Sequence, residues 1–151
     1  MYKALEIPVI VCGTDVDRKT NNDLINLIKN DVDYVDLTSK TSILEYIGLI
    51  KKAKCILTND TGIYHVAVVS QVPVTITAGA YTWDRYLNYN FKGKEKFKRP
   101  YIATKKWDCA NCDNKCIHNK TMTNTWPCLL DISEEDVWKK VKEMIKNEVL
   151  K

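Results

Sequence analysis

The stretch Ala53–Gly79 reads A-K-C-I-L-T-N-D-T-G-I-Y-H-V-A-V-V-S-Q-V-P-V-T-I-T-A-G. Within it, the short apolar run Cys55–Thr58 predicts a buried strand, and the turn Asn59–Gly62 follows it. The next residues, Ile63–Ser70, are apolar enough for a buried helix, and a proline then ends this segment before a second strand at Val74–Ala78. The stretch therefore predicts two parallel strands joined by a helix.

The same alternation extends toward the N-terminus. A continuous apolar run rich in β-branched residues, Ile7–Cys12, predicts a strand that is buried on both faces. Helical spacing follows at Arg18–Lys29, and Tyr34–Leu37 is a further short strand. Ser42–Glu45 matches a capping box that begins a helix through Lys52. With right-handed crossovers, this order predicts an α/β fold with a Rossmann-like parallel sheet and helices on both faces.

The length of 151 residues is sufficient for one hydrophobic core, so we expect a single domain over residues 1–151. Three of the four tryptophans and four of the six cysteines lie in a part without clear periodicity, which predicts a cysteine-rich insertion at about 81–130. A capping box at Ser133–Asp136 then begins an amphipathic C-terminal helix at 133–150. We expect this helix to pack on the sheet.

The charge balance is mildly basic, with 23 Lys+Arg against 19 Asp+Glu and a net charge of +4. Such an excess favours a phosphate-bearing or anionic-lipid partner. Basic and aromatic residues alternate at Lys92–Lys106, a pattern that can bind single-stranded nucleic acid. A solvated connecting loop with anchoring rings is the simpler interpretation, and we expect no nucleic acid as a partner.

Apolar runs are far shorter than the roughly 20 residues that a membrane-spanning helix needs, and no long apolar signal core stands at the N-terminus. The sequence therefore predicts a cytoplasmic protein, with a peripheral position at the inner face of the membrane as a further possibility.

Ligands of parallel α/β sheets bind beyond the carboxyl ends of the strands, so four loops are candidates for the site. They are Gly13–Asp17, Asp36–Thr41, Asn59–His65 and Gly79–Trp83. The third carries the pattern Asp60-Thr61-Gly62-x-x-His65. Free amides and the dipole at a helix start favour phosphate, and a glycine lets a pyrophosphate approach closely. The Asp60 carboxylate fits such a site if it accepts hydrogen bonds from sugar hydroxyls.

On these residues, Ala53–Gly79 resembles glycosyltransferase family 9, the bacterial lipopolysaccharide heptosyltransferases. Further matches are Gly13-Thr14 after the first strand, Tyr34–Leu37 followed by Lys40–Ser42, and the ending Cys128–Val137. The resemblance implies a two-domain GT-B architecture, of which this chain is similar to the C-terminal half. That half binds the nucleotide-diphosphate sugar, of the ADP-heptose type, for transfer to a lipopolysaccharide core or related glycan acceptor.

The donor-binding residues that the resemblance implies are Gly13, Thr14, Asp36, Asp60, Thr61, Gly62 and His65. Asp60 would contact the transferred sugar, and Asp36 the ribose hydroxyls. His65 would bind phosphate or brace the Asp60 loop. Asp36 could instead be an ordinary turn residue, and Thr14 could merely shape its turn. Lys19 is the nearest counterpart of a lysine that often assists the diphosphate in this family.

The family's general base belongs to an N-terminal acceptor domain, so we expect no catalytic residue in this chain and an incomplete reaction without a partner for that half. An alternative is a non-catalytic nucleotide-binding module that regulates or assembles with a separate partner chain. We expect no cofactor for catalysis.

Four clustered cysteines, Cys109, Cys112, Cys116 and Cys128, have a spacing that could gather thiolates around a structural zinc ion. An iron–sulfur cluster or disulfides formed by oxidation are alternatives, and His118 could replace one thiolate. A zinc-dependent nucleic-acid adaptor would combine this cluster with the basic stretch. Cys12 and Cys55 lie in predicted strands and are expected to be small buried residues.

Overall fold

A computed structural model describes residues 7–89, 92–93, 96–118 and 125–150. The chain divides into two compact units, Met1–Gly48 and Leu49–Lys151. The prediction of one domain with an insertion at about 81–130 stays a prediction. Each unit is built from parallel strands and helices, so the predicted α/β class is confirmed.

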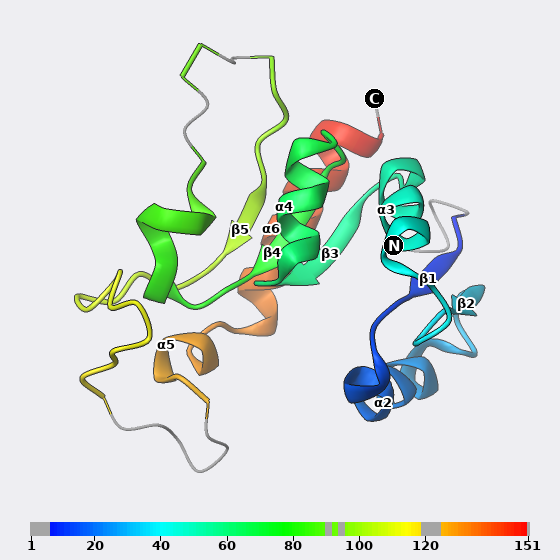
Figure 1. Ribbon diagram of the computed structural model, residues 1–151, viewed down its shortest axis with the longest axis horizontal. Coiled ribbons are helices and arrows are strands. Elements are labelled where there is room, and N and C mark those ends of the chain that lie inside the picture. Colours follow the sequence, from blue (N-terminus) through cyan, green and yellow to red (C-terminus); the bar gives the residue numbers. More distant parts are fainter. Residues whose placement is uncertain (1–6, 90–91, 94–95, 119–124, 151) are drawn as a thin grey trace. The chain divides into compact units, whose positions relative to one another are not determined.

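The first unit contains a two-stranded parallel sheet with one helix between its strands in the sequence (Figure 1). Its elements are β1 (Val9–Val11), the 3-10 turn η1 (Asp15–Asp17), α2 (Arg18–Ile28) and β2 (Tyr34–Asp36). Ile10 of β1 lies in register with Val35 of β2. The next helix, α3 (Ile43–Lys52), begins behind the predicted capping box, in which the Ser42 amide donates to Glu45 Oε2 at 2.7 Å.

The prediction that the first strand is buried on both faces is wrong. Val11 is buried, but Ile10 is 47% exposed, and its neighbour Val35 on β2 is 48% exposed. Two strands and one crossing helix in this unit do not provide enough elements to cover both faces of the sheet. Cys12, which follows β1, is likewise only half-buried. Cys55, before β3 in the second unit, is half-buried too, where both cysteines were expected to be buried.

The second unit contains a three-stranded parallel sheet in the order β3-β4-β5. Its strands are β3 (Ile56–Asn59), β4 (Val74–Thr77) and β5 (Tyr101–Ala103). The α-helices are α4 (Gly62–Val69), α5 (Pro127–Leu130) and α6 (Glu134–Met144). Further helical turns lie at η2 (Ala80–Thr82), η3 (Trp83–Leu87) and η4 (Ile145–Val149). Among the described residues, hydrogen bonds therefore join the strands into two sheets, where the sequence predicts one.

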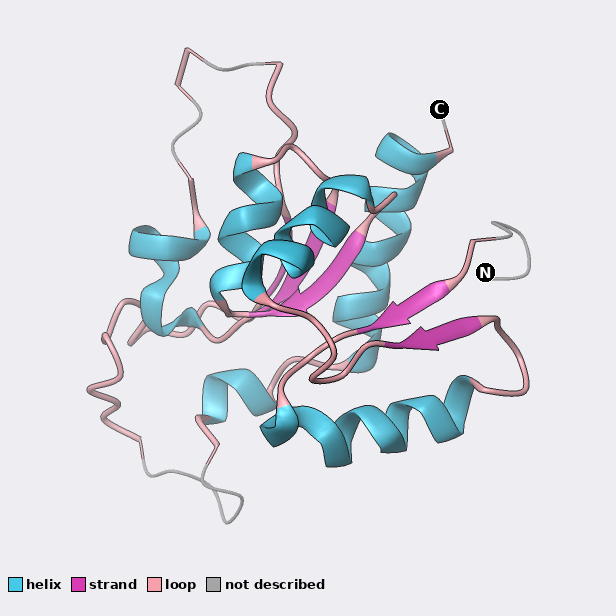
Figure 2. Cartoon of the chain, turned by 45° about the vertical axis from the view of Figure 1, so that its right-hand side comes forward, coloured by secondary structure: helices cyan, strands magenta, loops and turns pink. Residues whose placement is uncertain are grey.

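The strand β4 is at the centre of this second sheet and of its core. Val74 and Ile76 are buried, and Thr75, whose side chain points to the opposite face, donates a hydrogen bond to Met144 Sδ at 3.4 Å. The helices α4 and α6 both contact β4, and Figure 2 shows the strands between them. The predicted packing of the C-terminal helix on the sheet is thus confirmed. The edge strand β3 is less covered than predicted, since Leu57 is 55% exposed.

The capping box that begins α6 is also confirmed. Ser133 Oγ accepts a hydrogen bond from the Asp136 amide at 3.2 Å, and Asp136 Oδ2 accepts one from the Ser133 amide at 2.9 Å. No helix within the described ranges has the length and apolar character needed to cross a bilayer.

Candidate functional site

The start of α4 leaves backbone amides open to a ligand. Thr61 is the N-cap residue, with an extended backbone at φ −139° and ψ 171°, and its side chain makes no capping hydrogen bond. The amides of Gly62 and Ile63 precede the helix's own hydrogen-bond ladder. Thr61 and Gly62 are exposed, and no described atom beyond the immediate neighbours lies within 4 Å of a Cβ built on Gly62. Among the residues that the structure describes, the turn is therefore not capped by its threonine, and no atom outside its own neighbours covers Gly62.

The Asp60 carboxylate is held by hydroxyl groups from the loop after β4. Thr82 Oγ1 donates to Asp60 Oδ2 at 3.5 Å, and the Tyr81 hydroxyl also hydrogen bonds to Asp60. Burial, followed by the charge of Asp60, raises the pKa of Tyr81 to about 12. Because β3 and β4 are parallel neighbours, their carboxyl ends lie at the same edge of the sheet and bring these side chains together.

The His65 side chain, one turn into α4, belongs to an aromatic cluster. Its Nδ1 hydrogen bonds to the Tyr89 hydroxyl, and its ring lies 5.0 Å from that of Tyr64 and 6.5 Å from that of Tyr86. The Tyr64 hydroxyl donates to the Leu87 carbonyl at 2.7 Å, and burial raises the pKa of this tyrosine. These contacts fasten the first turn of α4 to the segment around η3. A phosphate contact of His65 stays a prediction.

In the first unit, Gly13 and Thr14 form a tight turn. The Thr14 amide and hydroxyl both donate to Asp17 Oδ2, at 2.8 and 2.9 Å. A Cβ on Gly13 would lie 2.9 Å from both Asp17 Cβ and Asn21 Nδ2, closer than real Cβ contacts allow. The close approach of these side chains therefore explains the glycine, and the turn-shaping interpretation of Thr14 is seen directly. The predicted diphosphate contacts of both residues stay predictions.

Asp36 adopts the turn geometry that the sequence left open as an alternative. Its Oδ1 accepts a hydrogen bond from the Thr38 amide at 2.9 Å, an Asx turn, and Lys40 Nζ donates to its carbonyl at 2.8 Å. The hydrogen bonds from Thr38, together with the charge of Lys40, lower the pKa of Asp36. A contact with ribose hydroxyls stays a prediction. Lys19 is an exposed residue of α2.

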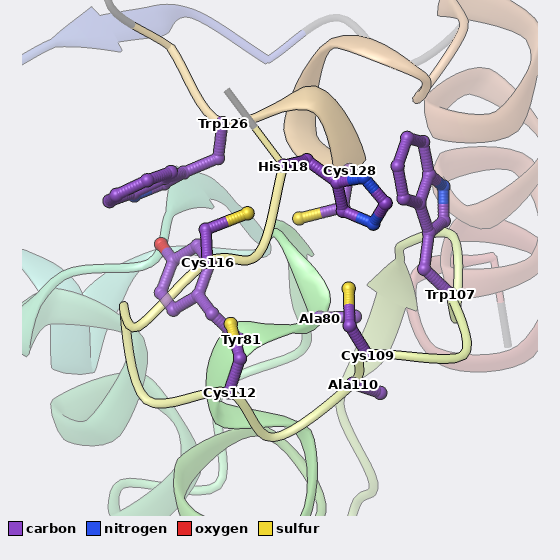
Figure 3. A pocket seen from close by; sticks show the side chains of 10 residues that line it. All are labelled: Ala80, Tyr81, Trp107, Cys109, Ala110, Cys112, Cys116, His118, Trp126 and Cys128. Atoms are coloured by element: carbon purple, nitrogen blue, oxygen red, sulfur yellow. The ribbon is translucent and has the colours of Figure 1, made fainter. Parts of the chain in front are cut away.

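The four clustered cysteines line one pocket in the second unit together with His118 (Figure 3). All four are free thiols, and Cys128 on α5 is buried. As placed, no three His, Cys, Asp or Glu side chains of the described ranges form a ready-made metal site.

Sequence reasoning named the loop Gly79–Trp83 as a candidate but assigned no role to Tyr81 or Thr82. The position of this loop, at the carboxyl end of the strand next to β3, is the signal that could have found them. The tyrosines around His65 carry no comparable signal, because Tyr86 and Tyr89 are distant from it in the sequence.

These features define a Rossmann-like α/β protein with an open helix start beside a partly exposed carboxylate. The model of glycosyltransferase family 9 (heptosyltransferase) matches residues 3–82, which is more than half of the 151 residues. The chain belongs to this family, as the resemblance of its sequence indicates. The match includes all seven predicted donor-binding residues and ends before the clustered cysteines.

Comparisons with curated proteins and with solved structures give no matching protein.

Proposed function

We propose that this glycosyltransferase-family chain binds a nucleoside diphosphate sugar of the ADP-heptose type as the donor for transfer to a lipopolysaccharide core or a related glycan. Membership of the family supports a glycosyltransferase role. The observation that carries the donor proposal is the open start of α4, where Thr61 leaves the first amides uncapped and Gly62 faces free space.

The diphosphate would occupy the amides of Gly62 and Ile63. Two features of a helix start favour an anion there, since the amides have no partner in the helix and the dipole places partial positive charge at this end. A glycine at this position allows phosphate oxygens to approach the backbone, because no side chain intervenes.

Asp60 would contact the sugar that is transferred. A carboxylate accepts about four hydrogen bonds, and those from Thr82 and Tyr81 use only part of this capacity. The same two hydroxyls orient the carboxylate before a ligand arrives. The remaining lone pairs suit sugar hydroxyls, which donate hydrogen bonds, better than they suit a phosphate oxygen.

Glycosyl transfer with inversion needs a base that removes the proton of the attacking hydroxyl, and a positioned base contributes about 10²–10⁴ in rate. We assign this base to the acceptor-binding part of the enzyme, on the cytoplasmic side of the membrane. The described residues then bind and orient the donor, and transfer requires the acceptor half.

Titration calorimetry with ADP, followed by the other nucleoside diphosphates, tests this proposal. We expect saturable binding of one diphosphate per chain and no comparable binding of the free nucleosides. A chain that is folded by circular dichroism and gives no binding heat with any nucleoside diphosphate would contradict the proposal.

A further inference from the structure

One pocket of the second unit has a volume of about 10 Å³. We call it the thiol pocket, because it is lined by Cys109, Cys112, Cys116 and Cys128, together with His118. A space of this size holds a group as large as one water molecule or one ion, and it is far too small for a nucleotide or a sugar. Figure 3 shows the four sulfur atoms turned toward this space from two separate segments of the chain. Trp107 and Trp126 also line it.

The loop that carries three of the cysteines has an unusual backbone. Asn111, Asp113 and Asn114 all have positive φ, at 68°, 51° and 64°, a conformation that non-glycine residues seldom adopt. Asn and Asp tolerate it best, but three such residues within four positions make a sharply coiled loop. This coiling places the three sulfur atoms on the same side of the loop. Such geometry persists where surrounding contacts determine it.

Main-chain hydrogen bonds fix the loop against the segment that follows β4. The Asn111 amide donates to the Ala80 carbonyl and the Asp113 amide to the Tyr81 carbonyl, both at 2.9 Å. The Asp113 side chain also pairs with Arg85 at 2.6 Å. The loop therefore lies against η2, the same turn whose residues hold Asp60.

Cys128 closes the pocket from the other side. Its side chain lies beside the backbone of Ala80, which also lines the pocket. Cys128 is 7% exposed, so its side chain is enclosed between α5 and the loop at 109–116. The four sulfur atoms therefore face one small space from two sides.

We propose that the thiol pocket binds one zinc ion through the sulfur atoms of Cys109, Cys112, Cys116 and Cys128. Four soft sulfur ligands from two segments suit tetrahedral zinc. Each thiol releases its proton as its sulfur coordinates the metal, so binding needs no oxidant or reductant. The sulfur atoms would draw together to about 2.3 Å from the ion, because their present positions do not yet form a metal site.

The bound metal would tie the loop at 109–116 and α5 to η2. Tyr81 lines the thiol pocket and also hydrogen bonds to Asp60, so the metal would stabilise the turn that orients this carboxylate. The site itself does not depend on the proposed function, because its four cysteines and His118 lie outside residues 3–82, the part of the chain that matches the family.

Metal analysis of the full chain, purified under reducing conditions, tests the proposal. We expect about one zinc per chain. Replacement by cobalt should give the intense sulfur-to-cobalt absorption of a tetrahedral thiolate site. Cys112→Ser and Cys116→Ser should each weaken zinc binding at least about tenfold. The matched control is Cys55→Ser, a cysteine outside the thiol pocket, which should keep wild-type affinity.

Thiol titration of the wild-type chain keeps the test decisive if a variant fails to fold. We expect the native zinc-bound chain to protect four of its six thiols from a thiol reagent, and a chelator to release them. A folded chain without bound metal, with all six thiols reactive before chelation, would overturn the proposal. Disulfides among the four cysteines or the visible absorption of an iron–sulfur cluster would overturn it too. If His118→Ala abolishes zinc binding while Cys116→Ser does not, the four-thiolate ligand set is wrong.

Discussion

Thr82 Oγ1 donates a hydrogen bond to Asp60 Oδ2 at 3.5 Å, which links the loops that follow the neighbouring strands β3 and β4. Thr82 is buried, whereas Asp60 is only half-buried, so the contact has one fixed end and one end that a ligand can reach. It also joins the helix start at Gly62 to the turn that lies against the cysteine-rich loop. The carboxylate is therefore oriented by the protein before any donor binds.

Asp60→Asn separates the sugar contact from the diphosphate contact. We expect affinity for the nucleoside diphosphate sugar to fall about 10–100-fold, since a hydrogen bond to a charged group contributes about 1.5–3 kcal/mol. Affinity for the nucleoside diphosphate alone should change by less than about twofold, because this ligand lacks the sugar. Calorimetry with both ligands measures the difference, and Glu135→Gln on α6 is the control. Equal losses for the two ligands would show that Asp60 does not act through the sugar.

Tyr64→Phe removes the buried hydrogen bond to the Leu87 carbonyl. We expect the free energy of unfolding to fall by about 1–3 kcal/mol, because the carbonyl is left unsatisfied in the core. Urea denaturation followed by circular dichroism gives this value. Tyr86→Phe, at an exposed tyrosine of the same segment, should change stability by less than about 0.5 kcal/mol. If both variants lose the same stability, α4 is not fastened to η3 through Tyr64.

Asp136 makes stability depend on acid. Lys105, 2.8 Å away, and the Ser133 amide and hydroxyl lower the pKa of Asp136 from 3.8 to about 2. Because the folded state has the lower pKa, the contribution of this carboxylate is complete above 3.8 and is lost as the pH falls toward about 2. Asp136→Asn should therefore be less stable than wild type at neutral pH, and the difference should shrink as the pH falls through about 2.

Urea denaturation over this pH range measures the effect, with Glu135→Gln in the same helical turn as the control. A stability difference between Asp136→Asn and wild type that stays constant down to the lowest pH would rule out the carboxylate as its source.

Gly13→Ala tests whether the first turn is tightly packed. The added methyl group would meet Asp17 Cβ at 2.9 Å, so we expect a loss of about 1–3 kcal/mol in unfolding free energy from overpacking. Gly62→Ala adds the same group to open space and should cost less than about 0.5 kcal/mol. Thermal unfolding of the two variants provides the comparison. Equal stability of both would mean that Asp17 and Asn21 can move aside without cost.

The central β-α-β unit was predictable because its signals are local. The apolar run of β4 and Pro73 before it mark where the strand begins and the preceding helix has ended. The capping boxes at Ser42 and Ser133 depend on side chains only three residues apart. The strand β5, with three residues inside a basic stretch, has no such periodicity and was missed. Burial of Ile10 was predicted wrongly because it depends on how many helices cover a sheet, which no local pattern reveals.

The candidate site shows the same division. The helix start could be expected from Asp60-Thr61-Gly62, since these three consecutive residues stand between a predicted strand and a predicted helix. The position of the loop Gly79–Trp83 after the neighbouring strand indicates that it lies near Asp60. Which of its side chains reaches the carboxylate depends on the register between β3 and β4, which no local pattern gives.

The most direct test compares ADP binding by Gly62→Val and Gly48→Val. A Cβ added to either glycine has no described atom within 4 Å outside the adjacent residues and the backbone of its own helix, so both variants should fold. Only Gly62 lies at the start of its helix, whereas Gly48 lies inside α3. The account predicts that Gly62→Val lowers affinity for ADP at least about tenfold, or about 1.4 kcal/mol, while Gly48→Val binds like wild type. Undiminished ADP binding by a folded Gly62→Val chain would contradict a diphosphate site at the start of α4.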